Sequence, residues 1–477
     1  MITFFVSIII LFGGYLIWGK LAERIFGIDP KRKTPAFTHQ DGVDYVPIKW
    51  WRVFLIQFLN IAGLGPIFGA ILGATFGPVA FIWIVFGGIF AGAIHDYFSA
   101  MLSMRNDGLS MPEVIGKYLG TGFKQFMRVF ILLLMILVGA VFITGPAGIL
   151  QALTPQTISK SIWVWIIIIY YLLATLLPID KIIGKIYPIF GFAILFMAFG
   201  ILIPILLGDY HLPELTFTSI TNMKTNASSF PIFPMLFVTI ACGAISGFHS
   251  TQSPLMARCL TNENLGRRVF YGAMIVESVI ALIWAAVGMA FFGGINELNL
   301  TLAEHNNDAA WAVNNISNTL LGKWGAILAI IGVVVAPITS GDTAFRSARL
   351  IIADFFKIKQ DKILKRILIC IPIFAIGILL TQIKFDIIWR YMAWSNQTLA
   401  TIVLWAITVF LAKERKFFWI SLIPALFMTS VVITYILVAP EGFSFSTSIS
   451  YPIALTVTLA TSVIFIFYNK KIKKLNV

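Results

Sequence analysis

Uninterrupted apolar runs limit what this chain can fold into more than any other feature of its sequence. The run from Ile162 to Leu177 contains no charged residue and no alternation of polar and apolar side chains. A hydrocarbon core of about 30 Å is crossed by about 20 apolar helical residues, and backbone groups in lipid are satisfied only in helices or closed barrels. With 59% hydrophobic and 12% charged residues, the chain also lacks the polar surface of a soluble protein. We therefore expect an all-α integral membrane protein.

The apolar runs predict about thirteen transmembrane helices. The first run has no basic segment before it and no small-residue cleavage site after it, so we interpret it as a span and not as a secretion signal. The predicted spans are 2–18, 51–75, 78–104, 125–145, 160–178, 184–207, 231–249, 268–292, 324–350, 364–383, 386–411, 417–438 and 449–468.

The basic residues divide unequally between the two sides of this layout. When successive connections are assigned to alternate sides, 30 of the 35 Lys and Arg residues fall on one side. Cytoplasmic connections are enriched in Lys and Arg, so we expect the N-terminus outside and the C-terminus in the cytoplasm. The net charge of +14 is then a topology signal and does not indicate a nucleic-acid partner. The five basic residues of the other side are Lys160, Lys224, Lys323, Lys384 and Arg390.

Two spans contain residues that interrupt helices. The second span includes Asn60-Ile61-Ala62-Gly63-Leu64-Gly65-Pro66, and the seventh includes Ala241-Cys242-Gly243-Ala244-Ile245-Ser246-Gly247-Phe248-His249. Proline removes a backbone donor, and glycine accepts non-helical dihedral angles. Close helix packing against small residues is the simpler explanation for any single glycine. The occurrence of both breaks, five spans apart, is harder to explain by packing alone.

An offset of five spans indicates an inverted repeat. Because five is odd, the second copy crosses the membrane in the opposite direction, as in transporters whose broken helices form a substrate site at the midplane. We expect one transporter domain, 1–477, with a 5+5 core. Amide groups freed in the breaks attract a carboxylate, and freed carbonyl groups coordinate a cation. The expected parts are an extra helix and cytoplasmic loop at 1–50, repeats at 51–207 and 231–411, and two extra helices at 412–477.

Ionisable and hydroxyl side chains at membrane depth are further candidates, because they are costly there unless they bind something. Thr339 and Ser340 offer the hard oxygen ligands that alkali cations accept, although each hydroxyl could bond to the carbonyl one turn back. Asp96, Glu277 and Asp342 are candidates for proton coupling. A structural hydrogen bond or ion pair is the alternative for each of these carboxyl groups.

Two more polar residues are candidate substrate ligands. His249 ends the second break, and Asn396 lies in a polar belt of the eleventh span. The three cysteines, Cys242, Cys259 and Cys370, are far apart in the sequence. Their spacing predicts neither a disulfide nor a zinc site.

The sequence carries no signature of an enzyme. It has no Walker A loop, no H-E-x-x-H and no G-x-S-x-G, so we expect neither an ATP-driven motor nor a hydrolase. A channel-type pore is an alternative class, but no filter-like repeat and no ring of like charge is visible. The paired breaks favour alternating access, with a small solute and the lipid bilayer as the expected partners.

Several motifs, in order along the chain, resemble the carbon starvation protein CstA family. They are Asp41-Gly42-Val43-Asp44-Tyr45-Val46-Pro47, Ile61 to Pro66, Phe90-Ala91-Gly92-Ala93 with Asp96, Arg105-Asn106-Asp107-Gly108, Cys242 to His249, Tyr271-Gly272-Ala273-Met274 with Glu277-Ser278, and Thr339 to Arg349. The resemblance implies a transporter of the bacterial cytoplasmic membrane that imports short peptides during carbon or nutrient starvation. Some members of the family are pyruvate–proton symporters, so pyruvate is the alternative substrate.

A looser resemblance is to the LeuT-type (LeuT/APC-like) sodium-coupled fold. The first broken helix of that fold carries Asn-x-x-Gly-Leu-Gly, which matches Asn60 to Gly65, although Pro66 departs from the pattern. The resemblance implies a possible sodium site, with Na⁺ as coupling ion and no other cofactor. Its ligands would be the carbonyl groups of Leu59, Ala62 and Ala336 and the hydroxyl groups of Thr339 and Ser340.

These observations predict a secondary active symporter driven by a proton or sodium gradient. We expect its substrate to lie between the two breaks, with its carboxylate facing freed amide groups. The predicted substrate-binding residues are Asn60, Gly63, Leu64, Gly65, Gly243, Ser246, Gly247, His249 and Asn396.

Overall fold

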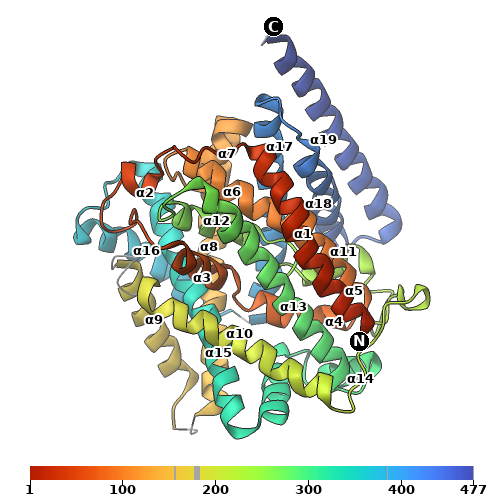
Figure 1. The fold of residues 1–477 in the computed structure, drawn as a ribbon. Coiled ribbons are helices and arrows are strands. Elements are labelled where there is room, and N and C mark those ends of the chain that lie inside the picture. Colours follow the sequence, from red (N-terminus) through yellow and green to blue (C-terminus); the bar gives the residue numbers. More distant parts are fainter. Residues whose placement is uncertain (155–156, 177–182, 384, 476–477) are drawn as a thin grey trace.

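The structure of this protein is a computed structural model that describes residues 1–154, 157–176, 183–383 and 385–475. The last residues of the predicted span 160–178 and the basic residue Lys384 lie outside the described residues. The regular elements of the described part are helices, gathered in one bundle (Figure 1).

The first half of the chain forms the helices up to residue 207. They are α1 (Ile2–Phe26), α2 (Pro35–Thr38), α3 (Trp50–Ile61), the π-helix η1 (Gly65–Gly69), α4 (Ala70–Ala74), α5 (Val79–Ile82), the π-helix η2 (Trp83–Gly92), α6 (Ala93–Arg105), α7 (Met111–Leu119), α8 (Thr121–Leu153), α9 (Lys160–Leu176) and α10 (Ile183–Leu207).

The second half continues in the same way to residue 475. Its helices are the short η3 (Phe217–Ser219), α11 (Ile232–Thr239), α12 (Gly247–Ala257), the short η4 (Glu263–Leu265), the π-helix η5 (Arg267–Tyr271), α13 (Gly272–Phe291), α14 (Ile295–Glu304), α15 (Ala309–Phe356), α16 (Ile363–Leu380), α17 (Phe385–Lys413), α18 (Trp419–Val438) and α19 (Thr447–Leu475).

By length and apolar composition, nine helices of the described part are able to cross a membrane, and ten if the bent pair α3 and η1–α4 is one span. The chain is therefore an all-helical, multi-pass membrane protein. These ten correspond to ten of the thirteen predicted spans. The remaining three fall on α9, which has 17 residues, on the interrupted pair α11 and α12, and on the second part of α15.

The longest helix, α15, contains a break that the sequence analysis did not place. Gly322 has φ 63° and ψ −169°, a conformation that a residue with a side chain rarely adopts. The helical segment before Gly322 and the preceding α14 lie outside the predicted spans. The predicted span 324–350 corresponds to the segment after the break.

Burial separates the centre of the bundle from its periphery. The apolar stretch of the span Glu263–Phe291 is 89% buried and that of Val79–Arg105 is 83% buried, against 22% for α1 and 17% for α19. In Figure 1, α19 lies along the edge of the bundle and its C-terminal end projects from it. A functional site is therefore expected where η2–α6 and α13 meet the interrupted helices.

Ion pairs that involve the connections form two groups, one at each end of the bundle. At one end, the Met1 amino group contacts Glu214, in the connection between α10 and α11. At the other end, Arg105 lies 3.0 Å from Glu263, and Arg346 lies 2.8 Å from Asp44. The N-terminus lies beside α4, α5 and α14 in Figure 1, whereas the C-terminus is at the end that carries α7.

Candidate transport site

The second predicted span is bent where glycine and proline interrupt it. α3 ends at Ile61 and a helix resumes at Gly65, and the two parts are inclined by 58°. Ala62, with φ −79° and ψ 57°, no longer has helical dihedral angles, although its N–H still donates to the Phe58 carbonyl oxygen at 2.8 Å. Pro66 lies in the first turn of the second part, where a missing N–H removes no helical hydrogen bond. The unwound segment, 62–64, is shorter than the sequence suggests, and Asn60 is still helical.

The seventh predicted span is interrupted over a longer segment. α11 ends at Thr239 and α12 begins at Gly247, so residues 240–246 are not helical. Ser246 has an extended backbone, with φ −142° and ψ 125°. Because α12 continues to Ala257, the prediction that this span ends at residue 249 is wrong. His249 lies in the first turn of α12 and not in the unwound segment.

The two interruptions contact each other. A Cβ atom added to Gly65 would overlap the side chain of Cys242 in the second break. A Cβ atom added to Gly69 would lie 2.8 Å from the carbonyl oxygen of Thr239, a distance that real Cβ atoms essentially never show. Glycine at both positions therefore allows the backbones of the two broken helices to approach closely. The fold places both interruptions around one point of the bundle.

Other small residues of the breaks pack against neighbouring helices. Gly63 faces Phe142 and the hydroxyl group of Ser340, which would lie 2.7 Å and 3.3 Å from an added Cβ atom. Gly243 packs directly against Ala281 of α13. Leu64 is fully buried in the hydrophobic core. Gly243 and Leu64 therefore provide helix contacts at the site.

Two asparagines beside the breaks differ in their hydrogen bonds. Asn396, on α17, accepts a hydrogen bond from the Phe248 amide at 2.5 Å and donates one to the Ser246 hydroxyl group at 2.8 Å. An amide at the start of α12 is thus satisfied by Asn396, and Gly247 packs against the Asn396 backbone. Asn60 is also buried, but neither oxygen nor nitrogen of its side-chain amide hydrogen-bonds to any described residue. Asn60 therefore keeps its full hydrogen-bonding capacity next to the first break.

Two of the predicted cation ligands, Ser340 and Leu59, contact each other from two different helices. The Ser340 hydroxyl group of α15 donates a hydrogen bond to the Leu59 carbonyl oxygen of α3 at 3.0 Å. The Thr339 hydroxyl group donates to the Ala336 carbonyl oxygen at 2.8 Å. Ala62 follows as the first unwound residue of the break. These oxygen atoms are of the type that alkali cations accept, and the Ser340–Leu59 contact links α15 to the first interruption.

A chain of buried ionisable groups runs beside the second break. His95 Nδ1 lies 2.8 Å from Asp96 Oδ1, and Asp96 Oδ2 lies 2.9 Å from His249 Nδ1. His249 Nε2 lies 3.5 Å from Glu277 Oε2. All four side chains are fully buried, and they come from α6, α12 and α13. The sequence singled out Asp96, His249 and Glu277 separately, whereas the structure joins them into one row.

The third predicted proton carrier lies elsewhere. Asp342, on α15, accepts a hydrogen bond from the Tyr170 hydroxyl group of α9 at 3.1 Å. It is buried but is not part of the row formed by Asp96, His249 and Glu277. The structure therefore separates the three predicted carboxyl groups into two places.

The sequence analysis missed a buried ion-pair cluster near the C-terminal end of α15. Asp44 lies 2.8 Å from Arg346 and 3.1 Å from Arg349, and all three side chains are almost fully buried. Burial alone would raise the pKa of Asp44, but the charges of Arg349 and Arg346 outweigh burial and hold that pKa well below its ordinary value. The available signal was the pair of arginines three residues apart in an apolar helix.

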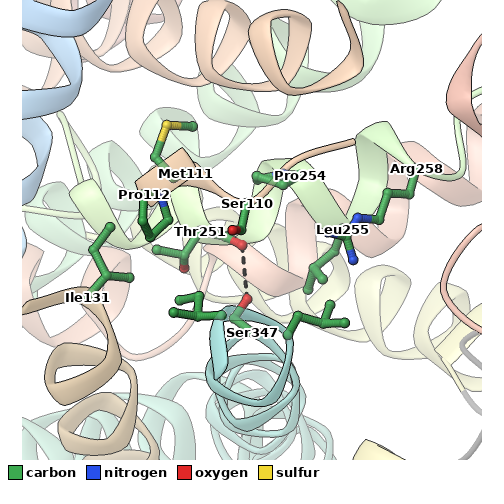
Figure 2. A pocket seen from close by; sticks show the side chains of 11 residues that line it. Ser110, Met111, Pro112, Ile131, Thr251, Pro254, Leu255, Arg258 and Ser347 are labelled. Carbon is green, nitrogen blue, oxygen red and sulfur yellow. Dashed lines mark hydrogen bonds between the residues drawn. The ribbon is translucent and has the colours of Figure 1, made fainter. Parts of the chain in front are cut away.

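A hydrogen bond beside this ion-pair cluster also joins α12 to α15. Figure 2 shows a small cavity there, about 10 Å³ in volume, where the Ser347 hydroxyl group donates a 2.9 Å hydrogen bond to the Thr251 carbonyl oxygen. Arg258 lies at the edge of the cavity and donates to the Gly108 carbonyl oxygen at 2.7 Å. A cavity of this size has room for about one water molecule, so little space is left between the helices here. The hydrogen bond between Ser347 and Thr251 links α15 to α12 on this side of the site.

Two discontinuous helices in contact, within a multi-pass helical bundle, are the architecture typical of secondary transporters, and the family of this chain is a transporter family and not an enzyme family. The fold is LeuT-like: the crystal structure of a manganese transporter from Eremococcus coleocola, of the Nramp type, superposes with a TM-score of 0.52. The match covers 91% of this chain and 99% of that chain at 15% sequence identity. At this identity the likeness concerns the fold alone.

The chain belongs to the carbon starvation protein CstA family, whose model matches residues 1–156 and 150–323. An uncharacterized membrane protein of Haemophilus influenzae is 45% identical over 339 residues, which is 61% of this chain and 91% of that protein. The peptide transporter CstA of Bacillus subtilis is 26% identical over 88% of this chain and 87% of its own length. The pyruvate/proton symporter BtsT of Escherichia coli is 26% identical over 55% of this chain, but the match covers only 45% of that longer protein.

Proposed function

We propose that this chain is a secondary active symporter that imports short peptides across the bacterial cytoplasmic membrane under carbon or nutrient starvation. The contact between the two interrupted helices, at Gly65 and Cys242, carries this proposal. Discontinuous helices that meet within a LeuT-like bundle build substrate sites in secondary transporters. A channel-type pore would not need such paired interruptions.

The peptide would bind beside the first break. Asn60 supports this position, because its buried amide makes no hydrogen bond with any described residue and can both donate to and accept from a peptide group. The backbone of Gly63 and Gly65 would face the solute from the same side. Ser246 and His249 would border it from the second break, while Asn396 holds the start of α12 in place.

The chain would cross the membrane thirteen times, with repeats at 51–207 and 231–411 and the N-terminus outside. Two groups of contacts support this topology. Met1 contacts Glu214, and both would be outside, whereas Arg105 pairs with Glu263 at 3.0 Å and both would be cytoplasmic. Each contact joins connections that the distribution of basic residues assigns to the same side.

Two routes are available for coupling to an ion gradient. Na⁺ would be held by Leu59, Ala62, Ala336, Thr339 and Ser340, and the 3.0 Å contact between Ser340 and Leu59 supports this route. A proton would use the buried carboxyl groups, and the row that joins Asp96 and Glu277 through His249 supports this route better than the separate Asp342 does.

Uptake into proteoliposomes tests the proposed function. Purified protein would be reconstituted, and a labelled dipeptide would be offered under an inward sodium gradient or an inward proton gradient, each imposed separately. We expect saturable accumulation of the dipeptide above its external concentration under one of the gradients, and none when the gradient is dissipated. Passive, non-saturating flux that ignores both gradients would contradict symport and favour a channel.

Pyruvate is the second candidate substrate. The pyruvate/proton symporter of Escherichia coli is 26% identical to this chain over 326 residues, and pyruvate carries a carboxylate as peptides do. Labelled pyruvate would be offered in the same proteoliposomes. Accumulation of pyruvate without accumulation of dipeptide would replace the peptide assignment and leave the symport mechanism intact. The peptide transporter of Bacillus subtilis favours peptide because its match spans 88% of this chain.

A further inference from the structure

A second kind of ligand set lies at the contact between the two breaks. Cys242 in the second break, His249 of α12 and Glu277 of α13 each offer one ligand atom, and these atoms all lie within 4.8 Å of one another. We propose that this cluster, the Cys242–His249–Glu277 site, binds a divalent transition-metal cation of the Zn²⁺ type. The spacing of the cysteines gave no sign of it, because the three residues meet only through the fold.

The buried side chains of the cluster have ligand atoms that point into it without a hydrogen bond. His249 Nε2 and both carboxylate oxygens of Glu277 are buried and make no hydrogen bond to any described residue. Nε2 lies 3.5 Å from Glu277 Oε2. Burying polar atoms without hydrogen bonds is costly, and a shared cation would satisfy all of them together.

The distances are close to those of a metal site. Zn²⁺ binds sulfur at about 2.3 Å and nitrogen or oxygen at about 2.0–2.2 Å, which places the ligand atoms of a tetrahedral site about 3.3–3.8 Å apart. The 3.5 Å separation of His249 Nε2 and Glu277 Oε2 falls within this range. Cys242, within 4.8 Å, would move by about 1 Å, and it lies in the unwound segment, where no helical hydrogen-bond ladder fixes it.

The outer contacts of His249 strengthen the assignment. Its other ring nitrogen, Nδ1, lies 2.9 Å from Asp96 Oδ2, and Asp96 is in turn 2.8 Å from His95. A carboxylate on the second nitrogen of a histidine fixes the tautomer and the ring orientation, and it is the usual outer contact of a metal-binding histidine. Nε2 is then left as the nitrogen that faces the cluster.

The chemistry of the three ligands selects the cation. Thiolate and imidazole favour Zn²⁺ and similar borderline ions, whereas Mg²⁺, Ca²⁺ and Mn²⁺ prefer oxygen ligands. Three protein ligands leave a fourth position open, as in zinc sites that bind a further small ligand. Cys242 is partly exposed while His249 and Glu277 are buried, so a cation would enter from the side of the cysteine. Occupancy would join the second break to α13.

Metal binding by the purified full-length chain tests this site without any transport measurement. Zn²⁺ would be titrated by calorimetry, and Co²⁺ would be added as a spectroscopic probe. We expect one Zn²⁺ per chain and a near-ultraviolet absorption band from the bond between the thiolate and Co²⁺. Cys242→Ser should abolish that band and weaken Zn²⁺ binding at least about tenfold, and Asp96→Asn should weaken it about 10- to 100-fold through the outer contact.

Cys370→Ser is the matched control, because Cys370 is another free cysteine, located on α16 and outside the cluster. It should leave stoichiometry, affinity and the Co²⁺ band unchanged. Glu277→Gln provides a second test that keeps the size of the side chain and should also weaken Zn²⁺ binding. Elution as a single species in gel filtration would show that each variant is folded. Absence of Zn²⁺ binding, or equal binding by wild type and Cys242→Ser, would overturn the site and would leave the proposed symport untouched.

Discussion

Ser340 is the residue through which α15 reaches the first break. Its hydroxyl group donates to the Leu59 carbonyl oxygen at 3.0 Å, and Gly63 makes room for it. The hydroxyl groups of Thr339 and Ser340 donate to the carbonyl oxygens of Ala336 and Leu59. In the proposed sodium site, the same oxygens would turn toward Na⁺, because a hydroxyl group both donates and accepts.

Removing both hydroxyl groups should therefore remove any dependence on sodium. In the double variant Thr339→Ala, Ser340→Ala, we expect sodium-driven uptake in proteoliposomes to fall at least about tenfold, since even outer contacts of metal sites change affinity by about 10- to 100-fold. The matched control is Thr456→Ala, Ser462→Ala on α19, where both hydroxyl groups also donate to carbonyl groups of their own helix. Unchanged sodium-driven uptake in the first variant would rule out this site.

The two interrupted helices depend on glycine where they touch. At Gly65, a side chain would overlap Cys242. Forcing an extra methyl group into a packed contact typically costs about 1–3 kcal/mol. Because the strain falls where we propose that substrate binds, its effect on transport should exceed its effect on the fold.

Gly65→Ala should lower the thermal denaturation midpoint of the detergent-solubilised protein and largely abolish uptake. Gly13→Ala is the matched control: it places the same methyl group on α1, where no atom lies within 4 Å, and both measurements should stay at wild-type values. If Gly65→Ala transports like wild type, the close approach of the two breaks is not required for function.

Local sequence signals predicted most of the elements but few of their ends. Apolar runs and glycine–proline segments act over one or two turns, so the positions of the nine or ten apolar spans and of both interruptions could be predicted. The extension of α12 to Ala257 was missed, because its polar residues read as a connection. Those residues, from Ser250 to Ser253, are buried. The sequence pattern of one segment does not show which other helices will cover it.

The site was predictable as separate residues and not as a cluster. Asp96, His249 and Glu277 stood out because ionisable side chains are rare at membrane depth. Their contacts join residues more than 25 positions apart, and no periodic pattern encodes such a contact. Cys242 shows the same limit, since it reads as a lone cysteine until the fold places it beside His249.

At the scale of the whole molecule, one buried carboxylate connects the loop before α3 to the end of α15. Asp44 contacts both Arg346 and Arg349. Removing one partner of a buried ion pair typically costs about 3–5 kcal/mol, because the remaining charge stays buried. Asp44→Asn should therefore lower the thermal denaturation midpoint strongly at pH 7. Asp361→Asn, which affects an exposed pair with Lys365, should leave it unchanged.

The same pair predicts how stability depends on pH. The pKa of Asp44 is lower in the folded protein than its ordinary value of 3.8, because Arg349 and Arg346 outweigh the effect of burial. The unfolded chain therefore binds this proton more tightly, and the stabilisation is present above about pH 4 and lost as the pH falls below 3.8. Wild type should lose more stability than Asp44→Asn between pH 5 and pH 3. An equal loss of stability in the two proteins would show that Asp44 does not cause this pH dependence.

The orientation of the whole molecule can be measured with single cysteines in intact cells. Phe217→Cys lies in the connection that contacts the N-terminus, where Phe217 is 97% exposed, and Lys359→Cys lies between α15 and α16. Because basic connections stay in the cytoplasm, a membrane-impermeant maleimide should label the first variant in intact cells and the second only after lysis. Labelling of the unmodified chain, which has three native cysteines, gives the background signal. The reverse pattern would invert the topology and, with it, the direction from which substrate enters.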